Sequence, residues 1–387
     1  MMAVSLAQRV ASLAPSATVQ NSDQIRSLRE TGRRILSLSS GDPNLVTDER
    51  IVAAGCRALQ DGDTHYTASA GLPRLRERLA ARECVRSGRQ INADSILITP
   101  GGKFALYAAL QSMVDPGDEV LLPDPGWVSY AACVRLCGGR PVAVSSLGGF
   151  DLDELRARTT DRTRAIIVNS PLNPTGRVIP KEELSALADF ARERGLWIVF
   201  DQVYCDLAYD EFPFLQAEPG LEDRLIVVDS FSKTFGMTGW RLGAFIGPEP
   251  VRKAVAKIIQ HSIYCVPGFV QQAGLRALEL EAELLPRYRE HFHKRLVPTQ
   301  AALARLAGWE CPLPSAGFYL FPRITGDDKA FARDLLDTKA VAVMPGSAFG
   351  AAGAGHVRIA LTCPEEEIAE AVAAIADFER SGNRRNV

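Results

Sequence analysis

The stretch from residue 95 to residue 250 alternates short apolar runs with longer amphipathic ones. The short runs have the length of β-strands and little internal polarity, which is typical of strands that are covered on both faces. On this basis strands are predicted at residues 95–99, 119–123, 141–145, 165–169, 196–201, 225–229 and 242–247. Because strands that alternate with helices form parallel sheets, the pattern predicts an α/β fold with a mainly parallel sheet between helices.

The amphipathic runs between the strands predict helices over residues 103–113, 127–136, 152–158, 180–194 and 250–261. The helix over 180–194 carries the clearest end signals. Pro180 occupies its first position, Glu182 and Glu183 lie in its first turn, and Gly195 follows its last residue. These residue types are favoured at those positions by the free backbone groups and the dipole of a helix.

The pattern changes from about residue 290 onward. A long charged helix is followed by short apolar runs at 317–322, 340–345 and 356–361 and by a final helix over 365–380. This arrangement predicts a second, smaller α+β domain. The length of 387 residues agrees with two domains, because one domain usually has about 100–200 residues.

Polar, glycine and aromatic residues gather directly after five of the predicted strands, at 101–103, 124–127, 169–176, 201–204 and 230–233. Ligands of parallel α/β sheets bind beyond the carboxyl ends of the strands. The sequence therefore predicts a single binding site to which all five strand ends contribute.

Composition and charge narrow the choice of partners. The chain is 47% hydrophobic and 23% charged, and its formal net charge is −2, so no nucleic-acid partner is expected. No apolar run approaches about 18 residues, so no membrane span is expected either. The first residues do not resemble a signal peptide, and the eight cysteines form no Cys-x-x-Cys pair. We therefore expect a cytoplasmic protein with reduced thiols and no metal site.

The segment 230–234, Ser-Phe-Ser-Lys-Thr, is the most informative motif of the chain. It places Lys233 after the apolar run 225–228, between small hydroxyl side chains, with Arg241 eight residues downstream. Such a lysine can be a covalent attachment point, and Ser230, Ser232 and Arg241 can grip a phosphate beside it. Those are the groups needed to hold pyridoxal 5′-phosphate (PLP). Taken alone, a lysine in a polar turn is more often simply solvated.

Three further motifs fit parts of the same cofactor. Gly101 and Gly102 form a strand-to-helix turn, whose free N–H groups favour a phosphate, although a plain tight turn explains them equally well. Trp127 follows a Pro-Gly pair and can stack on a flat ring, or can be a core tryptophan. Asn173 lies in the rigid turn 171–176, which aims its amide, although asparagine is also common in turns without such a role.

Three charged or phenolic residues complete the set. Asp201 ends an apolar run and requires a cationic partner, either a structural one or a protonated pyridine nitrogen. Tyr204, three residues on, can donate to the cofactor's phenolate oxygen. Arg358 lies on the face of strand 356–361 opposite Val357 and Ile359. Its guanidinium fork matches a substrate carboxylate, and an exposed strand arginine is the alternative.

Together these residues resemble the class I/II aminotransferases of PLP fold type I, over nearly the whole chain. The matching segments, in order, lie at 15–19, 41–43, 66–67, 71–72, 101–103, 127–130, 173–176, 201–204, 230–241 and 358. The lysine motif with its spaced arginine is highly specific, whereas the glycine turns are not. Within the family, the chain is most similar to the bacterial aspartate/prephenate-type branch.

The resemblance implies a large PLP-binding domain over 44–290 with a mainly parallel seven-stranded sheet. The small domain would combine 1–43 with 291–387. It also implies a homodimer with shared active sites, in which Tyr66 of one subunit reaches the phosphate bound by the other.

The family's residue roles carry over to matching positions of this sequence. Lys233 would form the internal aldimine and move the proton between Cα and C4′. Asp201 would hold the pyridinium nitrogen, Tyr204 and Asn173 the phenolate oxygen, and Trp127 would stack on the ring. The phosphate would be held by Ser230, Ser232, Arg241, Tyr66 and the turn formed by Gly101, Gly102 and Lys103. The substrate would meet Gly41 and Arg358 at its α-carboxylate, Trp127 and Asn173 near the ring, and Lys103 and Ser16 at a distal carboxylate.

The function implied is a PLP-dependent aminotransferase working by a ping-pong mechanism. Its leading substrates are aspartate or another dicarboxylic amino acid and a 2-keto acid such as 2-oxoglutarate. Alternatives are β-elimination, decarboxylation or oxidation on the same fold, or transamination of an aromatic, basic or non-proteinogenic amino acid. A regulator with an aminotransferase-like sensor domain would need an added DNA-binding domain, and only about 40 residues without basic bias precede Gly41.

Overall fold

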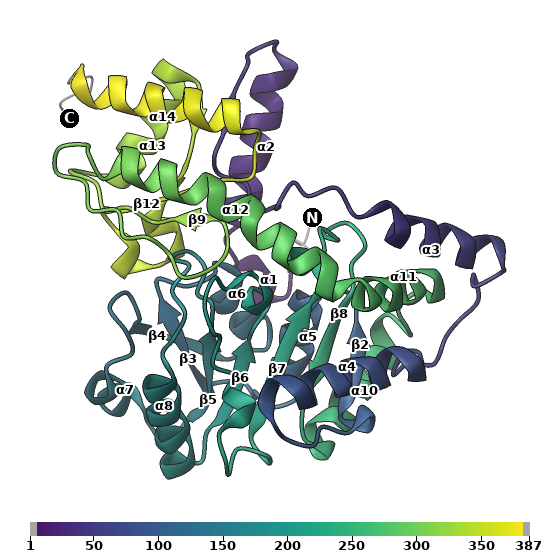
Figure 1. Cartoon of the computed structure of the whole chain (residues 1–387). Coiled ribbons are helices and arrows are strands. Elements are labelled where there is room, and N and C mark those ends of the chain that lie inside the picture. Colours follow the sequence, from purple (N-terminus) through teal and green to yellow (C-terminus); the bar gives the residue numbers. More distant parts are fainter. Residues whose placement is uncertain (1–5, 382–387) are drawn as a thin grey trace, which may run out of the picture.

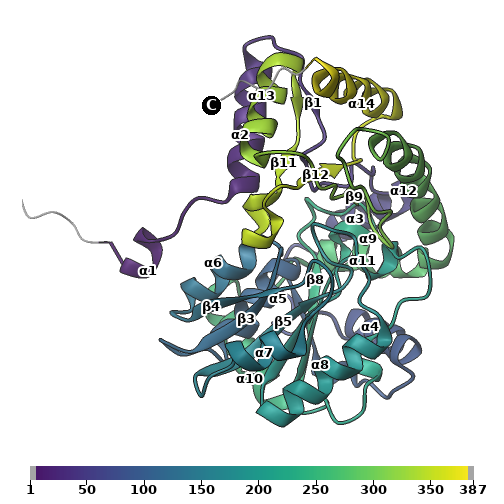
Figure 2. The same cartoon turned by 90° about the vertical axis from the view of Figure 1, so that its left-hand side faces the viewer.

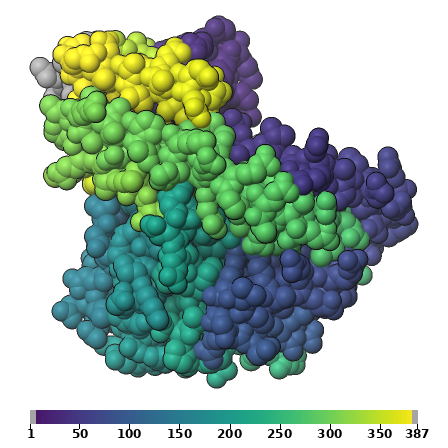
Figure 3. Space-filling model, viewed as in Figure 1, coloured from purple at the N-terminus to yellow at the C-terminus, as the bar shows by residue number. Residues whose placement is uncertain are grey.

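The computed structural model describes residues 6–381 of the chain. Figure 1 shows a lower part built around a large sheet and an upper part that combines the N-terminal segment with the C-terminal one. In the space-filling view the C-terminal residues, green and yellow, lie on top of the teal sheet region (Figure 3). The chain is thus an α/β protein with two packed parts.

The central sheet has seven strands in the spatial order β2-β8-β7-β6-β5-β3-β4. Its strands are β2 (Ile96–Thr99), β3 (Glu119–Asp124), β4 (Arg140–Ser145), β5 (Thr163–Asn169), β6 (Trp197–Asp201), β7 (Leu225–Ser230) and β8 (Gly243–Ile246). Only β8 runs antiparallel to its neighbours in this sheet. The prediction of a mainly parallel seven-stranded sheet is confirmed, and each predicted strand overlaps an observed one.

Both faces of the sheet are covered by helices, so the strands are largely buried, except for the edge strand β4, which is partly exposed. Along β5, Ile166 and Val168 belong to one hydrophobic cluster, and Ala165 and Ile167 to another. The first cluster includes side chains of α4 (Pro73–Ser87), α7 (Leu152–Arg158) and α8 (Lys181–Arg194). The second includes α5 (Gly102–Gln111), α6 (Ser129–Leu136) and α10 (Glu249–Ser262). Strand residues therefore alternate between two cores, which explains their uninterrupted apolar sequence.

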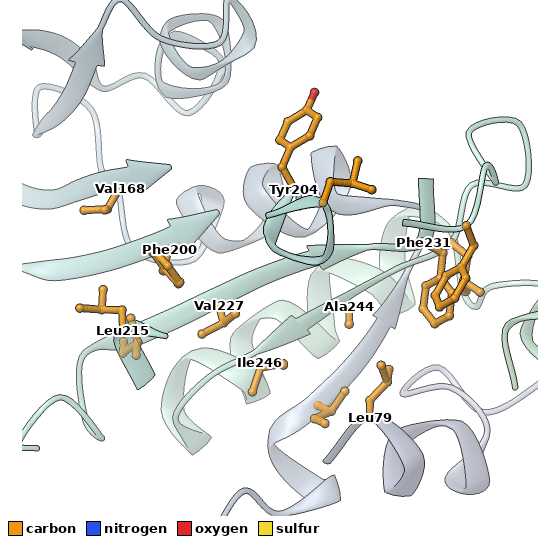
Figure 4. Packing of buried hydrophobic residues seen from close by; sticks show 14 of the residues in the cluster. Leu79, Val168, Phe200, Tyr204, Leu215, Val227, Phe231, Ala244 and Ile246 are labelled. Atoms are coloured by element: carbon orange, nitrogen blue, oxygen red, sulfur yellow. The ribbon is translucent and has the colours of Figure 1, made fainter. Parts of the chain in front are cut away.

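Figure 4 shows part of the first core, with Val168, Phe200 and Val227 pointing from neighbouring strands into the same layer. Tyr204 stands apart from them, with its ring directed away from the strands (Figure 4). The turn after β6 therefore lifts this side chain out of the sheet layer.

Three helices join the sheet region to the rest of the chain. Helix α3 (Glu49–Gln60) packs against α11 (Gly268–Glu279). Helix α12 (Glu281–Leu303) then runs from α11 to the upper part (Figure 1). The predicted domain boundary at residue 290 falls inside α12, so the two parts share one continuous helix. The division into domains stays a prediction.

The upper part contains α2 (Ala17–Glu30), α13 (Asp328–Lys339) and α14 (Glu365–Arg380) with short strands. Strand β1 (Leu36–Ser37) pairs with β10 (Val341–Ala342), and β12 (Val357–Ala360) pairs with β9 (Tyr319–Leu320) and β11 (Met344–Pro345). The short apolar run at 340–345 forms two separate strands, β10 and β11. The chain changes partner at Val343, so β10 and β11 belong to different sheets.

The N-terminal segment carries the short helix α1 (Gln8–Ala11), which extends to one side of the molecule in Figure 2. Leu6 and Val10 there are 73% and 52% exposed. Within residues 6–381, no helix is long and apolar enough to cross a membrane.

Candidate active site

A cavity of about 480 Å³ lies where the upper part meets the carboxyl ends of β5, β6 and β7. We define the cavity floor as Asn169, Asp201, Ser230 and Lys233, which lie at or just after those strand ends. Its cavity mouth consists of Thr18, Val19 and Ser22 of α2 together with Lys103 of α5. Gly41 and Arg358 contribute from the upper part. The strand ends thus converge on one site.

Lys233 lies in the single helical turn α9 (Phe231–Thr234) that follows β7. Its Nζ atom donates a hydrogen bond to the carbonyl oxygen of Gly41, at 2.6 Å. Burial lowers the pKa of Lys233 to about 8; the nearby cations Arg358 and Arg241 lower it too, whereas Asp42 opposes the shift. A lowered pKa increases the fraction of unprotonated amine at neutral pH, and this form is the nucleophile and base.

Asp201 ends β6 and is 4% exposed. Its Oδ2 atom accepts a hydrogen bond from the Tyr130 hydroxyl at 2.7 Å, and no cation pairs with it among residues 6–381. Burial raises the pKa of Asp201 to about 6, even though the hydrogen bond from Tyr130 opposes that shift. A buried carboxylate without a counter-ion is unfavourable by itself, so this position favours a cationic ligand.

Arg358 is a second buried charge without a counter-ion. It is 2% exposed, and one guanidinium nitrogen donates to Asn173 Oδ1 at 3.1 Å, the other to the carbonyl oxygen of Ser39 at 2.7 Å. Its guanidinium lies over the rings of Tyr319 and Phe349, at 4.5 and 4.8 Å from their centroids. No carboxylate pairs with it in the described part of the chain, and its Nε atom has no hydrogen-bond partner there. This arrangement suits a bound carboxylate.

Tyr204 and Tyr319 face each other above the floor, with their hydroxyl oxygens 3.0 Å apart. Burial raises the pKa of Tyr204 well above its usual range, so its hydroxyl stays protonated and can donate. Asn173 is held nearby because its backbone N–H donates to Asn169 Oδ1 at 3.0 Å. Two polar groups, a hydroxyl and an amide, are therefore presented at adjacent points of the cavity.

The turn from β2 into α5 forms a cradle for an anion. Gly101 has φ +87°, and a Cβ atom there would lie 2.6 Å from a guanidinium nitrogen of Arg241. Its N–H donates to the Thr99 carbonyl oxygen at 2.7 Å, which leaves the Gly102 N–H as the first free donor of the helix. Across the cradle, the Ser230 and Ser232 hydroxyls are 2.9 Å apart. Gly102, Ser230, Ser232 and Arg241 line the same cavity and could hold an anion there.

Other predicted site residues lie farther out. Lys103 is exposed, and its Nζ atom lies 4.9 Å from the Trp127 ring centroid. Ser16 does not line the cavity and instead bonds to Thr18 Oγ1 at 3.0 Å. Tyr66 is 82% exposed, does not line this cavity, and packs against Tyr264 with ring centroids 4.6 Å apart.

The lining residues that were not predicted to act in the site include two tyrosines, Tyr130 and Tyr319. Tyr130 follows the Trp127 motif by three residues, so helical spacing could have placed both on one face. Tyr319 belongs to a two-residue strand and meets Tyr204 across 115 positions of sequence. No local sequence pattern predicts that contact.

Comparison with known proteins agrees with this geometry. The profile of the family described as "Aminotransferase class I and II" matches residues 33–375. The aspartate/prephenate aminotransferase of Cereibacter sphaeroides is 36% identical, and the match covers 96% of this chain and 98% of that protein. The arginine–pyruvate transaminase of Pseudomonas aeruginosa is 38% identical, and the match covers 90% of each chain.

A solved structure shares the whole fold. The aspartate aminotransferase from Thermus thermophilus with maleate superposes with a TM-score of 0.91 at 36% identity. The match covers 97% of this chain and all of that one (100%).

Proposed function

The chain belongs to the class I and II aminotransferase family, and from this premise we propose that Lys233 holds PLP covalently while the enzyme moves an amino group from an L-amino acid to a 2-keto acid. Members of the family use PLP. The cavity of this chain offers a place for each part of that cofactor.

The observation that carries the proposal is the charge pattern of the cavity. Within residues 6–381, it brings together a lysine of lowered pKa, a buried carboxylate without a cationic partner and a buried guanidinium without an anionic one. Each of these costs free energy in the ligand-free protein. A cofactor with a protonated ring nitrogen and a substrate with a carboxylate would supply both missing charges.

The remaining residues fit the rest of the cofactor. Ser230, Ser232, Arg241 and the Gly102 N–H would hold its phosphate, and Tyr204 and Asn173 its phenolate oxygen. Trp127 lines the cavity with its indole and would cover the ring. Arg358 would hold the substrate α-carboxylate with two parallel bonds, assisted by the backbone at Gly41.

The bound cofactor would supply an electron sink for the carbanion that forms at the substrate Cα. The protein groups do the rest. Asp201 would hold a protonated ring nitrogen, because its negative charge stabilises a cation. The Lys233 amine, when not attached, would take the proton from the substrate Cα and deliver it again, and its pKa of about 8 suits a general base near neutral pH.

We infer a preference for dicarboxylic substrates from the electrostatics of the cavity. Its charged lining residues are four cations, Lys103, Lys233, Arg241 and Arg358, and one carboxylate, Asp201. Phosphate and α-carboxylate would occupy Arg241 and Arg358, which leaves Lys103 at the mouth for a third anionic group. A cationic side chain, as in arginine, would be repelled there. Aspartate with 2-oxoglutarate is therefore the leading pair.

The test is a single-turnover experiment. Protein reconstituted with PLP should show a visible absorbance band that disappears on addition of aspartate and returns on addition of 2-oxoglutarate. Lys233→Ala should abolish the band. Absence of any band in the wild-type protein would refute the cofactor assignment. Elimination, decarboxylation and oxidation regenerate the PLP form without a keto acid, so a band that persists or returns before any keto acid is added would indicate one of these reactions instead.

We further infer a homodimer that shares its active sites. The support is Tyr66, whose exposed hydroxyl-bearing ring does not reach the cavity of its own chain. A dimer predicts that Tyr66→Phe weakens PLP binding, and that mixing it with Lys233→Ala restores one wild-type site per heterodimer. A monomer at working concentration in sedimentation experiments would contradict this.

A further inference from the structure

A cluster of buried ionic side chains lies beside the helical turn that carries Lys233, and the proposed reaction does not use it. Arg82 and Arg86 come from α4, and each side chain is 9% exposed. Both pair with Asp206 and Asp229, whose side chains are 6% exposed. We call these four residues the buried ion cluster. Asp206 lies in the short turn η2 (Cys205–Leu207), and Asp229 lies in β7.

The buried ion cluster is bonded to both ends of the lysine turn α9. Asp229 Oδ1 accepts the N–H of Ser230, the residue that caps the start of α9, at 2.7 Å. Asp206 Oδ2 accepts the hydroxyl of Thr234, the last residue of α9, at 2.9 Å. Lys233 lies between these two anchors. A single helical turn is not stable by itself, so its position depends on such tertiary contacts.

The same cluster is bonded to the segment that follows β6. Asp206 lies two residues after Tyr204 in the chain. Glu83, an ion-pair partner of Arg86, accepts a hydrogen bond from Gln202 Nε2 at 3.3 Å, and Gln202 directly follows Asp201. Gln216 Nε2 also donates to Glu83, at 2.6 Å. The cluster therefore connects the Asp201–Tyr204 segment with the Lys233 turn.

The electrostatics keep the Asp206 anchor strong, whereas burial raises the pKa of Asp229 to about 6. Burial alone would raise the pKa of Asp206, but Arg82 and Arg86 hold it below its usual value, so its carboxylate stays ionised. An ionised acceptor binds a hydroxyl about twice as strongly as a neutral one. Buried ion pairs of this kind add little net stability compared with apolar residues, so stability alone does not account for the cluster.

We propose that the buried ion cluster, acting through Asp206 and the Thr234 hydroxyl, positions the Lys233 amine relative to Asp201 and Tyr204. Thr234 is then a positioning residue rather than a catalytic one. The inference rests on the proposed function, because the position of Lys233 matters only if the amine attaches the cofactor.

The test removes one hydroxyl. Thr234→Val keeps the shape of the side chain and deletes the bond to Asp206, whereas Thr234→Ser restores a hydroxyl. The matched control is Thr163→Val, because Thr163 also is buried and donates to a buried carboxylate, Glu119 Oε2, at 3.2 Å. Thr163 begins β5, at the opposite end of the strand from Asn169. Both valine variants should lower the unfolding temperature of the PLP-free protein similarly.

Only the Thr234 variant should change the behaviour of Lys233. We expect the rate at which PLP forms its covalent bond with Lys233, followed by visible absorbance, to fall roughly 10- to 100-fold in Thr234→Val. In the PLP-free protein, an amine-reactive anhydride should label Lys233 faster, since the loosened turn releases Nζ from Gly41. Thr163→Val should change neither quantity, and Thr234→Ser should recover most of the covalent-bond rate.

If Thr234→Val and Thr163→Val give equal rates and equal labelling, the cluster is only structural and the proposal is wrong. Gln202→Met, at the other end of the network, provides a second test should Thr234→Val fail to fold. It should weaken PLP binding roughly two- to tenfold, and unchanged binding would overturn the connection to Asp201. A wild-type protein that never attaches PLP would refute the proposed function, while the labelling comparison would still test the position of Lys233.

Discussion

At the cavity floor, Asp201 and Ser230 are buried, with 4% and 7% exposure, and both have hydrogen-bond partners. At the cavity mouth, by contrast, Val19 is 54% exposed, and Lys103 is exposed and lies above the ring of Trp127. The floor is fixed by strand ends and buried bonds. The mouth consists of an N-terminal helix and flexible side chains that adjust at little cost. We expect the floor to determine which chemistry occurs and the mouth to determine which substrate enters, and mutations in the two regions should separate these roles.

The largest effect is expected at Lys233. Lys233→Ala should lower kcat by at least about 10³-fold, because both the covalent attachment and the proton-transferring amine are lost. Turnover should be measured together with visible absorbance after loading with PLP and dialysis against buffer without PLP. Lys257→Ala, on helix α10, is the control lysine and should behave as wild type. A dialysed Lys233→Ala protein that keeps its visible band would place the attachment elsewhere.

Mutation of Arg358 should have the next largest effect, and it should change substrate binding but not cofactor binding. Arg358→Lys keeps the charge but loses the planar fork, so kcat/KM should fall roughly 10²-fold through KM for every amino acid tested. The PLP absorbance should stay unchanged, since Arg358 would contact the substrate. Equal losses in PLP affinity and in substrate affinity would show instead that Arg358 supports the floor through Asn173.

The floor was largely predictable from sequence because its members follow strands that are recognisable by their apolar runs. Lys233, Asp201 and Ser230 each come at or just after a strand end, as does Asn173 beside the floor, and parallel strands place those ends together. The contacts that hold them were not predictable. Arg358 meets Asn173 across 185 positions, and Arg86 meets Asp206 across 120. The sequence of a charged helix does not show which of its arginines will be buried.

The mouth was less predictable for a related reason. Ser16 was expected to contact substrate, but the helix α2 turns Thr18, Val19 and Ser22 toward the cavity instead. The rotation of a helix against a distant domain depends on packing that no local motif encodes. The same holds for the run 340–345, whose split between two sheets depends on partners at Leu36–Ser37 and Val357–Arg358.

A third prediction concerns the unpaired carboxylate of Asp201 in the cavity floor, whose burial destabilises the folded protein. The pKa of Asp201 is about 6 in the folded protein against 3.8 as its ordinary value. Below pH 3.8 Asp201 is protonated in both the folded and the unfolded protein. Between pH 3.8 and about pH 6 it releases its proton only in the unfolded protein, so the PLP-free protein loses stability as pH rises. Above about pH 6 the full cost, on the order of 1–3 kcal/mol, is present.

Asp201→Asn removes that cost, because an amide has no charge to desolvate and the Tyr130 hydroxyl can accept or donate. The PLP-free variant should unfold at higher temperature than wild type at pH 8, and the difference should shrink toward pH 4.5. Activity should nevertheless collapse. A variant that is less stable than wild type at pH 8 would show that a cation already neutralises Asp201 in the free protein.

The smallest effect is expected at Lys103 in the cavity mouth. It tests whether the floor and the mouth have separate roles in chemistry and in substrate choice. Lys103→Ala should lower kcat/KM for aspartate by up to about 5-fold, since an exposed ion pair contributes up to about 1 kcal/mol. It should leave kcat/KM for an apolar amino acid unchanged, and the aspartate effect should shrink at high salt because exposed charges are screened. Lys253→Ala, whose ammonium pairs with Glu249 on the surface of α10, controls for lost positive charge. An equal loss for aspartate and for an apolar donor would mean that Lys103 acts through the Gly101–Gly102 cradle, and the mouth would then share the chemical role of the floor.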